Sequence, residues 1–372
     1  MHIGIDSRDA FAPRPRGVGK SLRALLGALA AAAPAWRFTA YTDRNGNAPV
    51  AAGVHVAHVT LRGDRLNAWE RVRLPFAAWR DGVDLLHCPG QTAPPIAPCP
   101  IVLTVHDLIP LRIGDGLSAE DIGRFRRSLA GAVKKAARII AVSEYTKRDL
   151  LTEFRLPEDR IDVVPWGVEM PLDRSHDVGR FEALAAAHGV RQPFFVAFGG
   201  EAPRKNVPRL IETVRELARV LTGDVQLLLI GVPDSARRRF AELADGLSVS
   251  KQVVALGYLS DRDVATLLAF AEALVYPSLY EGFGLPVLEA MAVGTPVITS
   301  NTTSLPEVAG DAAVLVDPTS VGAIADAMRQ CYLNAAVKTE LGLRGRRRAA
   351  TFTWDRAARS TVAAYRRALG AA

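Results

Sequence analysis

Short apolar runs alternate with longer amphipathic segments along nearly the whole chain of 372 residues. In the N-terminal half, seven runs rich in β-branched and aromatic residues predict strands at 2–6, 37–42, 54–59, 84–88, 101–107, 138–143 and 161–165. Helical segments lie between most of these runs, for example at 18–33, 119–137 and 144–153. Strands that alternate with helices predict a parallel sheet that is covered on both faces.

The alternation weakens between residues 167 and 193 and then resumes. The second series predicts strands at 194–199, 225–231, 253–258, 273–278, 295–300 and 312–317. We therefore expect an α/β protein with two Rossmann-like, doubly wound domains facing a cleft. The predicted N-terminal domain covers 1–170, a linker covers 171–190, and a C-terminal domain covers 191–352. Ligands of open parallel sheets bind beyond the carboxyl ends of the strands, so motifs directly after strands are the candidates for a site.

Composition limits the class of protein. The chain is 49% hydrophobic and 23% charged, which is typical of a globular protein and excludes wholesale disorder. Cys88, Cys99 and Cys331 are too few and too scattered for a disulfide framework or a zinc site. The first residues lack the basic start and apolar run of a signal peptide, and no apolar stretch reaches the roughly 20 residues of a membrane span. We expect a cytoplasmic protein, soluble or peripheral at a membrane.

The net charge of +7 indicates either an anionic partner or an ordinary solvated surface. Nucleic acid is disfavoured as the partner, because no recognition motif accompanies the charge. Two basic segments, 69–80 and 121–139, also carry aromatic or aliphatic residues. Each is interpreted either as a solvated helix face or as a segment that docks on an anionic membrane surface.

The most informative stretch is "YPSLYEGFGLPVLEAMAVGTPVITSN", residues 276–301. It predicts a strand end, a glycine-bearing loop, a helix that Gly294 closes, and a further strand. The backbone N–H groups of Gly284 and Leu285 would lie at the helix N-terminus, where an anion binds readily. Glu281 precedes the helix and Glu289 lies inside it, so one carboxylate could meet a ligand from the loop and the other from the helix. Taken singly, either glutamate is more readily interpreted as a structural residue than as a ligand contact.

This stretch resembles the signature of the retaining glycosyltransferases of family 4, which are two-domain nucleotide-sugar enzymes with the B-type fold. The family pattern is Glu, seven residues, Glu, within a segment of the kind "EGFGLP-x-x-EAMA". The resemblance implies that Gly282, Phe283, Gly284 and Leu285 contact the donor. It also implies that Glu289 binds the ribose hydroxyls, and that Glu281 binds sugar hydroxyls near the developing oxocarbenium ion.

Two more segments of the C-terminal half resemble the same family. "AFGGEAPRKNVPRLIE" (197–212) is similar to the loop that holds the donor diphosphate, with Arg204 and Lys205 as the cations that stabilise the leaving phosphate. "VVALGYLSDRD" (253–263) is similar to the strand and loop beneath the nucleotide base, which implies contacts from Gly257, Tyr258 and Leu259.

The triplet "DRD" (261–263) imitates the Asp-x-Asp metal motif of another glycosyltransferase fold. It opens a predicted helix, where acidic residues cap N–H groups, and we interpret it as that cap. We expect no cofactor and no essential metal ion.

In the N-terminal half, "TVHDLIPL" (104–111) is similar to a subgroup with many mannosyl- and rhamnosyltransferases. The resemblance implies that His106 is catalytic and that His106 and Asp107 lie on the acceptor side. The loop at 84–95 resembles the acceptor-side loop of that subgroup. Residues 163–169 resemble the family's linker turn, with Trp166 in the place of an Asn, and 353–372 resemble the helix that crosses back onto the N-terminal domain.

The segment "RPRGVGKSL", Arg14 to Leu22, imitates a nucleotide-binding P-loop. A P-loop needs glycine where this chain has Arg14, and a dinucleotide fingerprint needs its third glycine at Leu22. The segment resembles instead the family's "GIGR" loop, which implies that Gly17 and Gly19 allow the backbone to approach the donor. Lys20 is a candidate for a phosphate or acceptor contact.

These observations predict a retaining, metal-independent hexosyltransferase that moves mannose from GDP-mannose. The catalytic residues would be Glu281, His106, Arg204 and Lys205. The expected acceptor is a glycan or polyprenyl-linked glycan of bacterial surface polysaccharide synthesis, such as lipopolysaccharide, at the inner face of the plasma membrane. The alternatives are a UDP-sugar or dTDP-rhamnose donor, a non-catalytic sugar-nucleotide binding module, and a P-loop phosphohydrolase.

Overall fold

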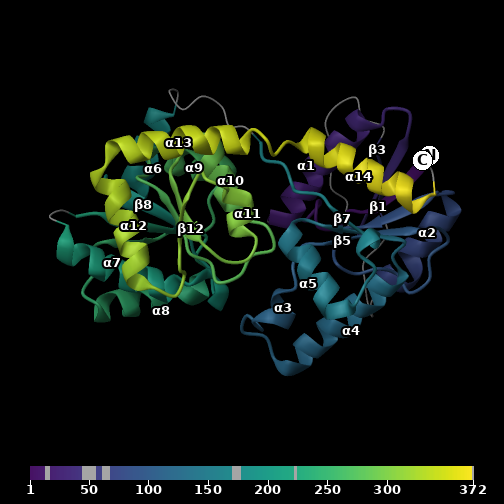
Figure 1. Ribbon diagram of the computed structural model, residues 1–372, viewed down its shortest axis with the longest axis horizontal. Helices are drawn as coiled ribbons and strands as arrows, with labels where there is room; N and C mark the ends of the chain where they lie inside the picture. Colours follow the sequence, from purple (N-terminus) through teal and green to yellow (C-terminus); the bar gives the residue numbers. More distant parts are fainter. Residues whose placement is uncertain (13–16, 44–55, 61–67, 170–176, 222–223, 371–372) are drawn as a thin grey trace. The chain divides into compact units, whose positions relative to one another are not determined.

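The chain divides into two units, each with its own sheet (Figure 1). The computed structural model describes residues 1–12, 17–43, 56–60, 68–169, 177–221 and 224–370, with only the backbone given for 56–60. The first unit comprises Met1–Gly167 and Phe352–Ala372, and the second comprises Val168–Thr351. None of the helices among these residues combines the length and apolar character needed to cross a membrane.

The first unit is built on a seven-stranded parallel sheet in the order β3-β2-β1-β4-β5-β6-β7. The strands are β1 (His2–Asp6), β2 (Arg37–Thr42), β3 (Val56–Thr60), β4 (Leu85–Cys88), β5 (Ile101–Val105), β6 (Arg138–Ala141) and β7 (Ile161–Val163). All seven predicted strands are confirmed, with small shifts at their ends, and residues 54–55 of the third prediction lie outside the described residues.

Helices cover both faces of this sheet, as successive residues of β4 show. Leu85 packs among residues of α1 (Gly17–Ala32) and α14 (Trp354–Ala368). Leu86, one residue further, packs on the opposite face with α2 (Leu74–Arg80) and α4 (Ala119–Lys135). Because both faces are buried, the strands are apolar at consecutive positions. The unit also contains η1 (Trp69–Arg73), α3 (Ile109–Arg112), α5 (Glu144–Phe154) and η2 (Glu158–Arg160).

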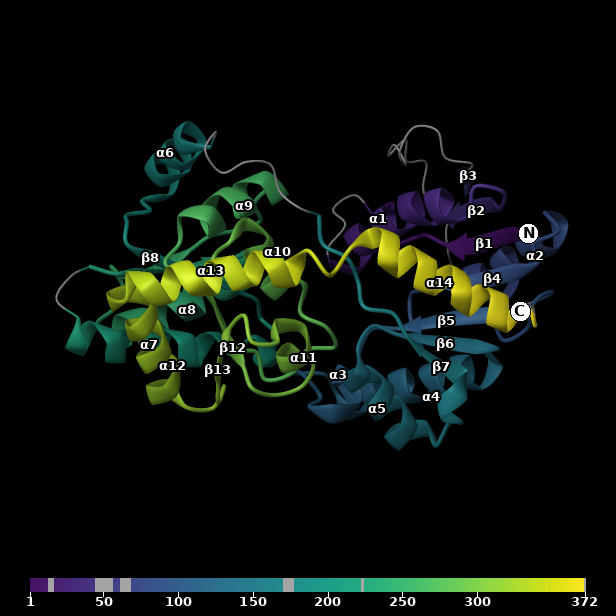
Figure 2. The same ribbon diagram turned by 45° about the horizontal axis from the view of Figure 1, so that its top comes forward.

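The C-terminal helix α14 belongs to the first unit and lies along α1 (Figure 2). The chain leaves this unit after Gly167 and re-enters it at Phe352. A Cβ on Gly167 would lie 2.4 Å from the backbone nitrogen of Trp354, so only glycine fits this backbone contact. Tyr365 of α14 is fully buried, and its hydroxyl lies 2.8 Å from Nδ1 of His87 on β4.

The second unit has a six-stranded parallel sheet in the order β10-β9-β8-β11-β12-β13. The strands are β8 (Phe194–Phe198), β9 (Gln226–Ile230), β10 (Val253–Ala255), β11 (Leu274–Tyr276), β12 (Val297–Ser300) and β13 (Val314–Val316). All six predicted strands of this half are confirmed, and the expectation of two doubly wound α/β sheets is confirmed with them.

The core of this unit forms where the sheet meets three helices, with Phe195, Leu227 and Ile298 pointing toward them. These helices are α7 (Val207–Val220), α8 (Asp234–Gly246) and α12 (Val321–Leu333). The remaining elements are η4 (Pro203–Lys205), α9 (Asp261–Phe270), α10 (Leu285–Val293), α11 (Leu305–Ala309) and α13 (Ala335–Ala349).

Part of the stretch expected to be a linker, 171–190, is a helix of the second unit. Residues Val178–His188 form α6, which ends at Gly189 with φ +67°. Phe181 is the one buried residue of α6, and its ring stacks on those of Phe194 and Phe270. A helix anchored by one aromatic side chain has little amphipathic signal, which explains the wrong assignment. Residues 170–176 lie outside the described residues.

Candidate functional site

Two loops meet at the carboxyl edge of the second sheet. Strands β8 and β11 are parallel neighbours, so the loops that follow them leave the sheet on the same side. The loop after β8 contains Arg204 and Lys205 in the short helix η4, and the loop after β11 contains Glu281. The backbone N–H of Leu279 donates to the carbonyl of Arg204 at 2.8 Å, which ties the loops together.

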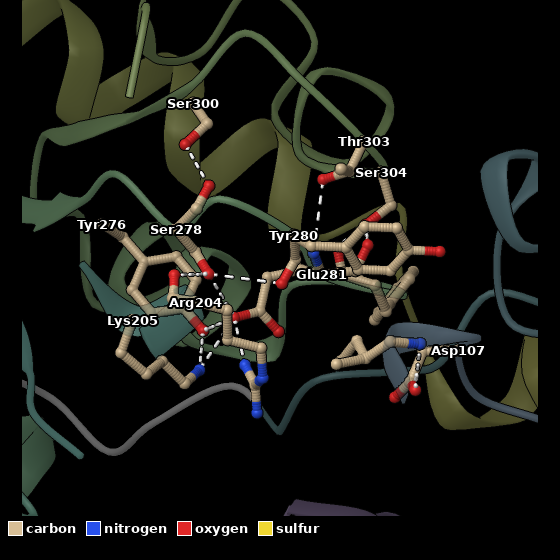
Figure 3. Close-up of polar contacts among 12 residues, drawn as sticks. Asp107, Arg204, Lys205, Tyr276, Ser278, Tyr280, Glu281, Ser300, Thr303 and Ser304 are labelled. Atoms are coloured by element: carbon tan, nitrogen blue, oxygen red, sulfur yellow. Dashed lines mark hydrogen bonds and ion pairs between the residues drawn. The ribbon is translucent and has the colours of Figure 1, made fainter. Parts of the chain in front are cut away.

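The centre of the site is the carboxylate of Glu281 (Figure 3). Its Oε1 accepts hydrogen bonds from Arg204 Nη1 at 2.8 Å and from Lys205 Nζ at 2.8 Å. The Tyr276 hydroxyl lies 2.7 Å from the same oxygen, and Ser278 Oγ lies 2.8 Å from it. We call these five residues the Glu281 cluster. The structure thus brings together three residues that the sequence predicted and two that it did not.

The charges of the cluster determine the protonation of Glu281. Burial alone would raise the pKa of this carboxyl group, but Lys205 and Arg204 lower it to about 2. Glu281 is therefore ionised at neutral pH, and the three charged groups together carry a net charge of one positive unit. A positive excess in a largely buried cluster favours an anionic ligand, because attraction between charges is stronger away from water.

Tyr276 is a member of the cluster that sequence reasoning missed. Its hydroxyl also accepts a hydrogen bond from Lys205, whose Nζ lies 4.8 Å from the centre of the tyrosine ring. Burial, followed by the nearby negative charge of Glu281, raises the pKa of Tyr276 well above its usual value. As the last residue of β11, it looks like an ordinary core residue in the sequence, and only the pairing of β11 with β8 reveals its contacts.

Asn206 holds the cationic turn in place and was also missed. Its backbone is left-handed, with φ +60°, a conformation that asparagine tolerates better than most residues. The side-chain Nδ2 donates to the carbonyls of Pro277 at 2.9 Å and Pro318 at 2.7 Å. Asn206 therefore joins the end of η4 to the loops that follow β11 and β13.

The N-terminus of α10 lies where the sequence placed it. Gly284 caps this helix with φ +126°, and a Cβ there would lie 2.9 Å from Leu305, so glycine is required. Gly282 and Phe283 are buried, and the Phe283 side chain packs in the interior. Only the backbone of Phe283 could contact a sugar-nucleotide donor, and its carbonyl oxygen already accepts a hydrogen bond from Ser304 Oγ at 2.7 Å.

Four of the predicted donor-binding residues have partly or fully exposed side chains. Leu285 is half-buried in the first turn of α10, and Glu289 is exposed further along that helix. The Tyr258 side chain is 58% exposed in the loop after β10, followed by the half-buried Leu259. These roles stay predictions.

The "DRD" triplet opens α9, but it is not the helix cap. Ser260 is the N-cap, and its Oγ accepts the N–H of Asp263 at 3.2 Å. Asp261 and Asp263 lie in the first turn, where their charges suit the helix dipole. Asp263 also pairs with Arg180 at 2.6 Å. Within the described ranges, no three His, Cys, Asp or Glu residues are grouped so as to hold a metal ion.

His106 follows β5 in the first unit and is only 8% exposed. Its Nε2 lies 2.6 Å from the carbonyl of Pro89, so this nitrogen carries the proton. Nδ1 is then an acceptor, and it has no hydrogen-bond partner among the described residues. The ring also packs edge-to-face with the ring of Trp166, with 4.8 Å between centroids. Burial lowers the pKa of His106 to about 4, so the imidazole is neutral at pH 7.

Asp107 has a local structural contact. Its Oδ1 accepts the backbone N–H of Ile109 at 3.1 Å, at the start of the one-turn helix α3. The acceptor-side role of Asp107 stays a prediction.

The glycines of the "RPRGVGKSL" segment differ from the expectation. Helix α1 begins at Gly17, so Gly17 and Gly19 lie in its first turn and not in a loop before it. Gly19 is buried, whereas Gly17 is exposed and Lys20 is half-buried. Residues 13–16, which include Arg14, lie outside the described residues.

Two family models match the chain. A model described as "Glycosyltransferase Family 4" matches residues 15–170, and a model described as "Glycosyl transferases group 1" matches residues 182–348. The first covers most of the first unit and the second covers most of the second unit.

Curated relatives carry related names. The chain is 30% identical over 265 residues to the O-antigen chain mannosyltransferase B of Escherichia coli, a match that covers 71% of this chain and 70% of that protein. It is 34% identical over 235 residues to the MMP alpha-(1->4)-mannosyltransferase of Mycolicibacterium hassiacum, covering 62% of this chain and 54% of that one. A serotype-specific mannosyltransferase of E. coli, WbdA, is 28% identical, and the match spans about a third of its length.

Solved structures agree in fold. Anabaena HepE in complex with UDP and glucose has a TM-score of 0.77 at 16% identity, covering 98% of both chains. WaaG, a glycosyltransferase involved in lipopolysaccharide biosynthesis, has a TM-score of 0.73 at 18% identity, again covering 98% of both chains. At these identities the similarity establishes the fold alone.

Proposed function

We propose, since this chain belongs to glycosyltransferase family 4, that it transfers a mannosyl residue from a nucleoside-diphosphate mannose to a glycan acceptor. The observation that carries the proposal is the Glu281 cluster, where two cations and one carboxylate meet at the carboxyl edge of the second sheet. The names of the relatives, which include mannosyltransferases of O-antigen and serotype-specific glycans, support mannose. GDP-mannose is the favoured donor.

The donor would bind to the second unit. Arg204 and Lys205 would pair with its diphosphate, as the positive excess of the cluster favours, together with backbone N–H groups at the N-terminus of α10. Glu289 would accept hydrogen bonds from the ribose hydroxyls. Tyr258 and Leu259 would lie against the base.

The reaction would proceed with retention of the anomeric configuration. The bond between the sugar C1 and the β-phosphate oxygen breaks, a bond forms between C1 and the acceptor oxygen on the same face, and the acceptor proton passes to the phosphate. Arg204 and Lys205 stabilise the negative charge that builds on the leaving diphosphate, so no metal ion is required for departure. The ionised Glu281 stabilises the positive charge that develops on the sugar ring.

Residues of the first unit would bind the acceptor side. A neutral His106 with Nδ1 as an acceptor that no described residue uses suits a sugar hydroxyl, which can donate a hydrogen bond to it. Asp107 and Lys20 would contribute further contacts. The acceptor would be a growing surface glycan on a polyprenyl carrier, at the inner face of the plasma membrane.

A donor panel tests this function. We expect nucleotide release from GDP-mannose in the presence of acceptor to exceed release from UDP-glucose and dTDP-rhamnose, with none from GTP, and to persist in EDTA. Nucleotide release from the UDP-sugar and not from GDP-mannose would show that the donor is a UDP-sugar. Hydrolysis of GTP would indicate a phosphohydrolase. Binding without turnover across a wide acceptor panel would favour a non-catalytic module. Proton NMR of the product should show the α-anomer from an α-linked donor, and a β-linked product would exclude retention.

A further inference from the structure

One helix of the first unit is apolar on two opposite faces. The continuous helical segment η1–α2 buries Trp69, Leu74 and Ala77 in the core. On the other side, Val72, Phe76 and Trp79 are 61%, 57% and 67% exposed. Their spacing of four and then three residues places them on one side of the helix, and the rings of Phe76 and Trp79 lie 5.7 Å apart. We call Val72, Phe76 and Trp79 the α2 ridge.

A cluster of exposed aromatic side chains is uncommon on a surface that faces only water, and it marks an interaction site when it is contiguous. The core does not need these three residues, because the opposite face of the same helix already packs on the sheet. The partner that binds the ridge must therefore offer an apolar environment to aromatic side chains.

The charge distribution points to an anionic occupant. The first unit contains 27 Lys and Arg against 18 Asp and Glu, a formal charge of +9, whereas the second contains 19 against 21, a charge of −2. The positive excess of the whole chain thus belongs to the unit that carries the α2 ridge. Arg71 and Arg80 are exposed beside the ridge. Helix α4, which packs on the same face of the sheet, exposes Arg127, Lys134 and Lys135.

We propose that the α2 ridge docks the first unit on an anionic lipid bilayer, with Phe76 and Trp79 at the boundary between headgroups and acyl chains. Aromatic rings favour this boundary, and flanking arginines pair with anionic headgroups. The proposal rests on the proposed function in one respect: docking would bring the enzyme to a lipid-linked acceptor. Docking itself can be measured without any catalysis.

Co-sedimentation of the full chain with vesicles tests the docking. Wild-type protein should bind vesicles that contain phosphatidylglycerol, bind poorly to phosphatidylcholine alone, and lose binding as salt rises. The double variant Phe76→Ser, Trp79→Ser should bind anionic vesicles at least about tenfold more weakly than the wild type, because it removes most of the apolar area that would insert. Arg71→Glu should weaken binding at low salt.

A matched control removes apolar residues of similar exposure from the second unit. The double variant Val220→Ser, Leu333→Ser changes side chains that are 59% and 63% exposed, and it should bind vesicles as the wild type does. Equal binding by the ridge variant and the wild type would overturn the proposal, as would equal losses in both double variants. A dimer that the ridge variant abolishes, without any vesicle binding, would assign the ridge to a second copy of the chain instead.

Transfer to a short, lipid-free saccharide separates this proposal from the proposed function. The ridge variant should keep wild-type turnover in that assay, since none of its changes lies in the donor or acceptor residues. Vesicle binding by a protein that transfers no sugar would contradict the proposed function and leave the docking intact.

Discussion

Oε1 of Glu281 accepts hydrogen bonds from the cationic side chains of Arg204 and Lys205. A diphosphate that bound to these two side chains would compete with Glu281 for their hydrogen bonds. The same carboxylate is suited to a second task, because an ionised group near the sugar stabilises positive charge in the transition state. Under the proposed function, Glu281 would therefore oppose donor binding and support donor cleavage.

Substitution of Glu281 separates these effects. In Glu281→Gln, we expect kcat to fall about 100-fold, the scale typical for loss of one preorganised electrostatic group. The affinity for GDP should stay equal or rise, because the competing charge is gone. Steady-state kinetics and titration of GDP measure the two quantities. Glu272→Gln, which removes the partner of Lys338 elsewhere in the second unit, is the control and should change neither. A Glu281→Gln variant with normal kcat would show that this carboxylate is not part of the reaction.

At this scale, the sequence identified the charged centre of the site but not its neighbours. Glu281, Arg204 and Lys205 were predicted because their motifs resemble those of a family. Tyr276, Ser278 and Asn206 were missed because their importance comes from contacts across the sheet edge, and each residue type is ordinary at its place in the sequence.

Among the elements, the return helix α14 depends on a buried polar link. Tyr365 contacts Nδ1 of His87, and Nε2 of His87 lies 2.8 Å from Thr104 Oγ1. Both ring nitrogens of a buried histidine are thus satisfied, which joins α14, β4 and β5. Loss of one partner leaves a buried polar atom without compensation.

Tyr365→Phe tests the contribution of this link. We expect the free energy of unfolding of the first unit to fall by about 1–3 kcal/mol, the cost of an unsatisfied buried group. Urea unfolding followed by tryptophan fluorescence measures the change. Tyr145→Phe in α5 changes a tyrosine that is only half-buried, in contrast to the fully buried Tyr365, and should cost less. Equal losses in the two variants would show that the link to His87 contributes nothing special.

The elements themselves were predictable to a large extent. Strands that are buried on both faces produce unbroken apolar runs, as at Leu85 and Leu86, and such runs are visible in a sequence. Helix α6 was mistaken for a linker because its docking depends on the single side chain of Phe181. The cap of α9 was assigned to the acidic triplet because the hydrogen bond that the Asp263 N–H donates to Ser260 Oγ is a local detail of backbone geometry.

For the whole molecule, the two units should respond differently to acid. Burial lowers the pKa of His87 to about 3 and the pKa of His106 to about 4. Both side chains lie in the first unit. A histidine with a lowered pKa stabilises the fold fully above its unfolded pKa of about 6.5, and this stability is lost as the pH falls toward the folded value. Glu281 in the second unit also stabilises the fold less as the pH falls, but its contribution is lost only between about pH 4.5 and about pH 2.

Calorimetry at two pH values measures this difference. Between pH 7.5 and pH 5, we expect the first unit's melting temperature to fall by several degrees while that of the second unit changes less. His87→Gln should reduce the shift, even if it lowers the overall stability. Identical shifts in the two units would show that neither histidine is held neutral by burial.

The central claim is that the Glu281 cluster holds the diphosphate of a sugar nucleotide, and calorimetric titration of GDP and UDP into the full chain tests it most directly. Lys205→Ala should weaken the better of the two ligands about tenfold or more, since a charge-assisted contact to phosphate is lost from a largely buried site. Lys338→Ala, which breaks an ion pair with Glu272 in the same unit, should bind as the wild type does. If Lys205→Ala binds both nucleotides with wild-type affinity, the cluster is not the diphosphate site.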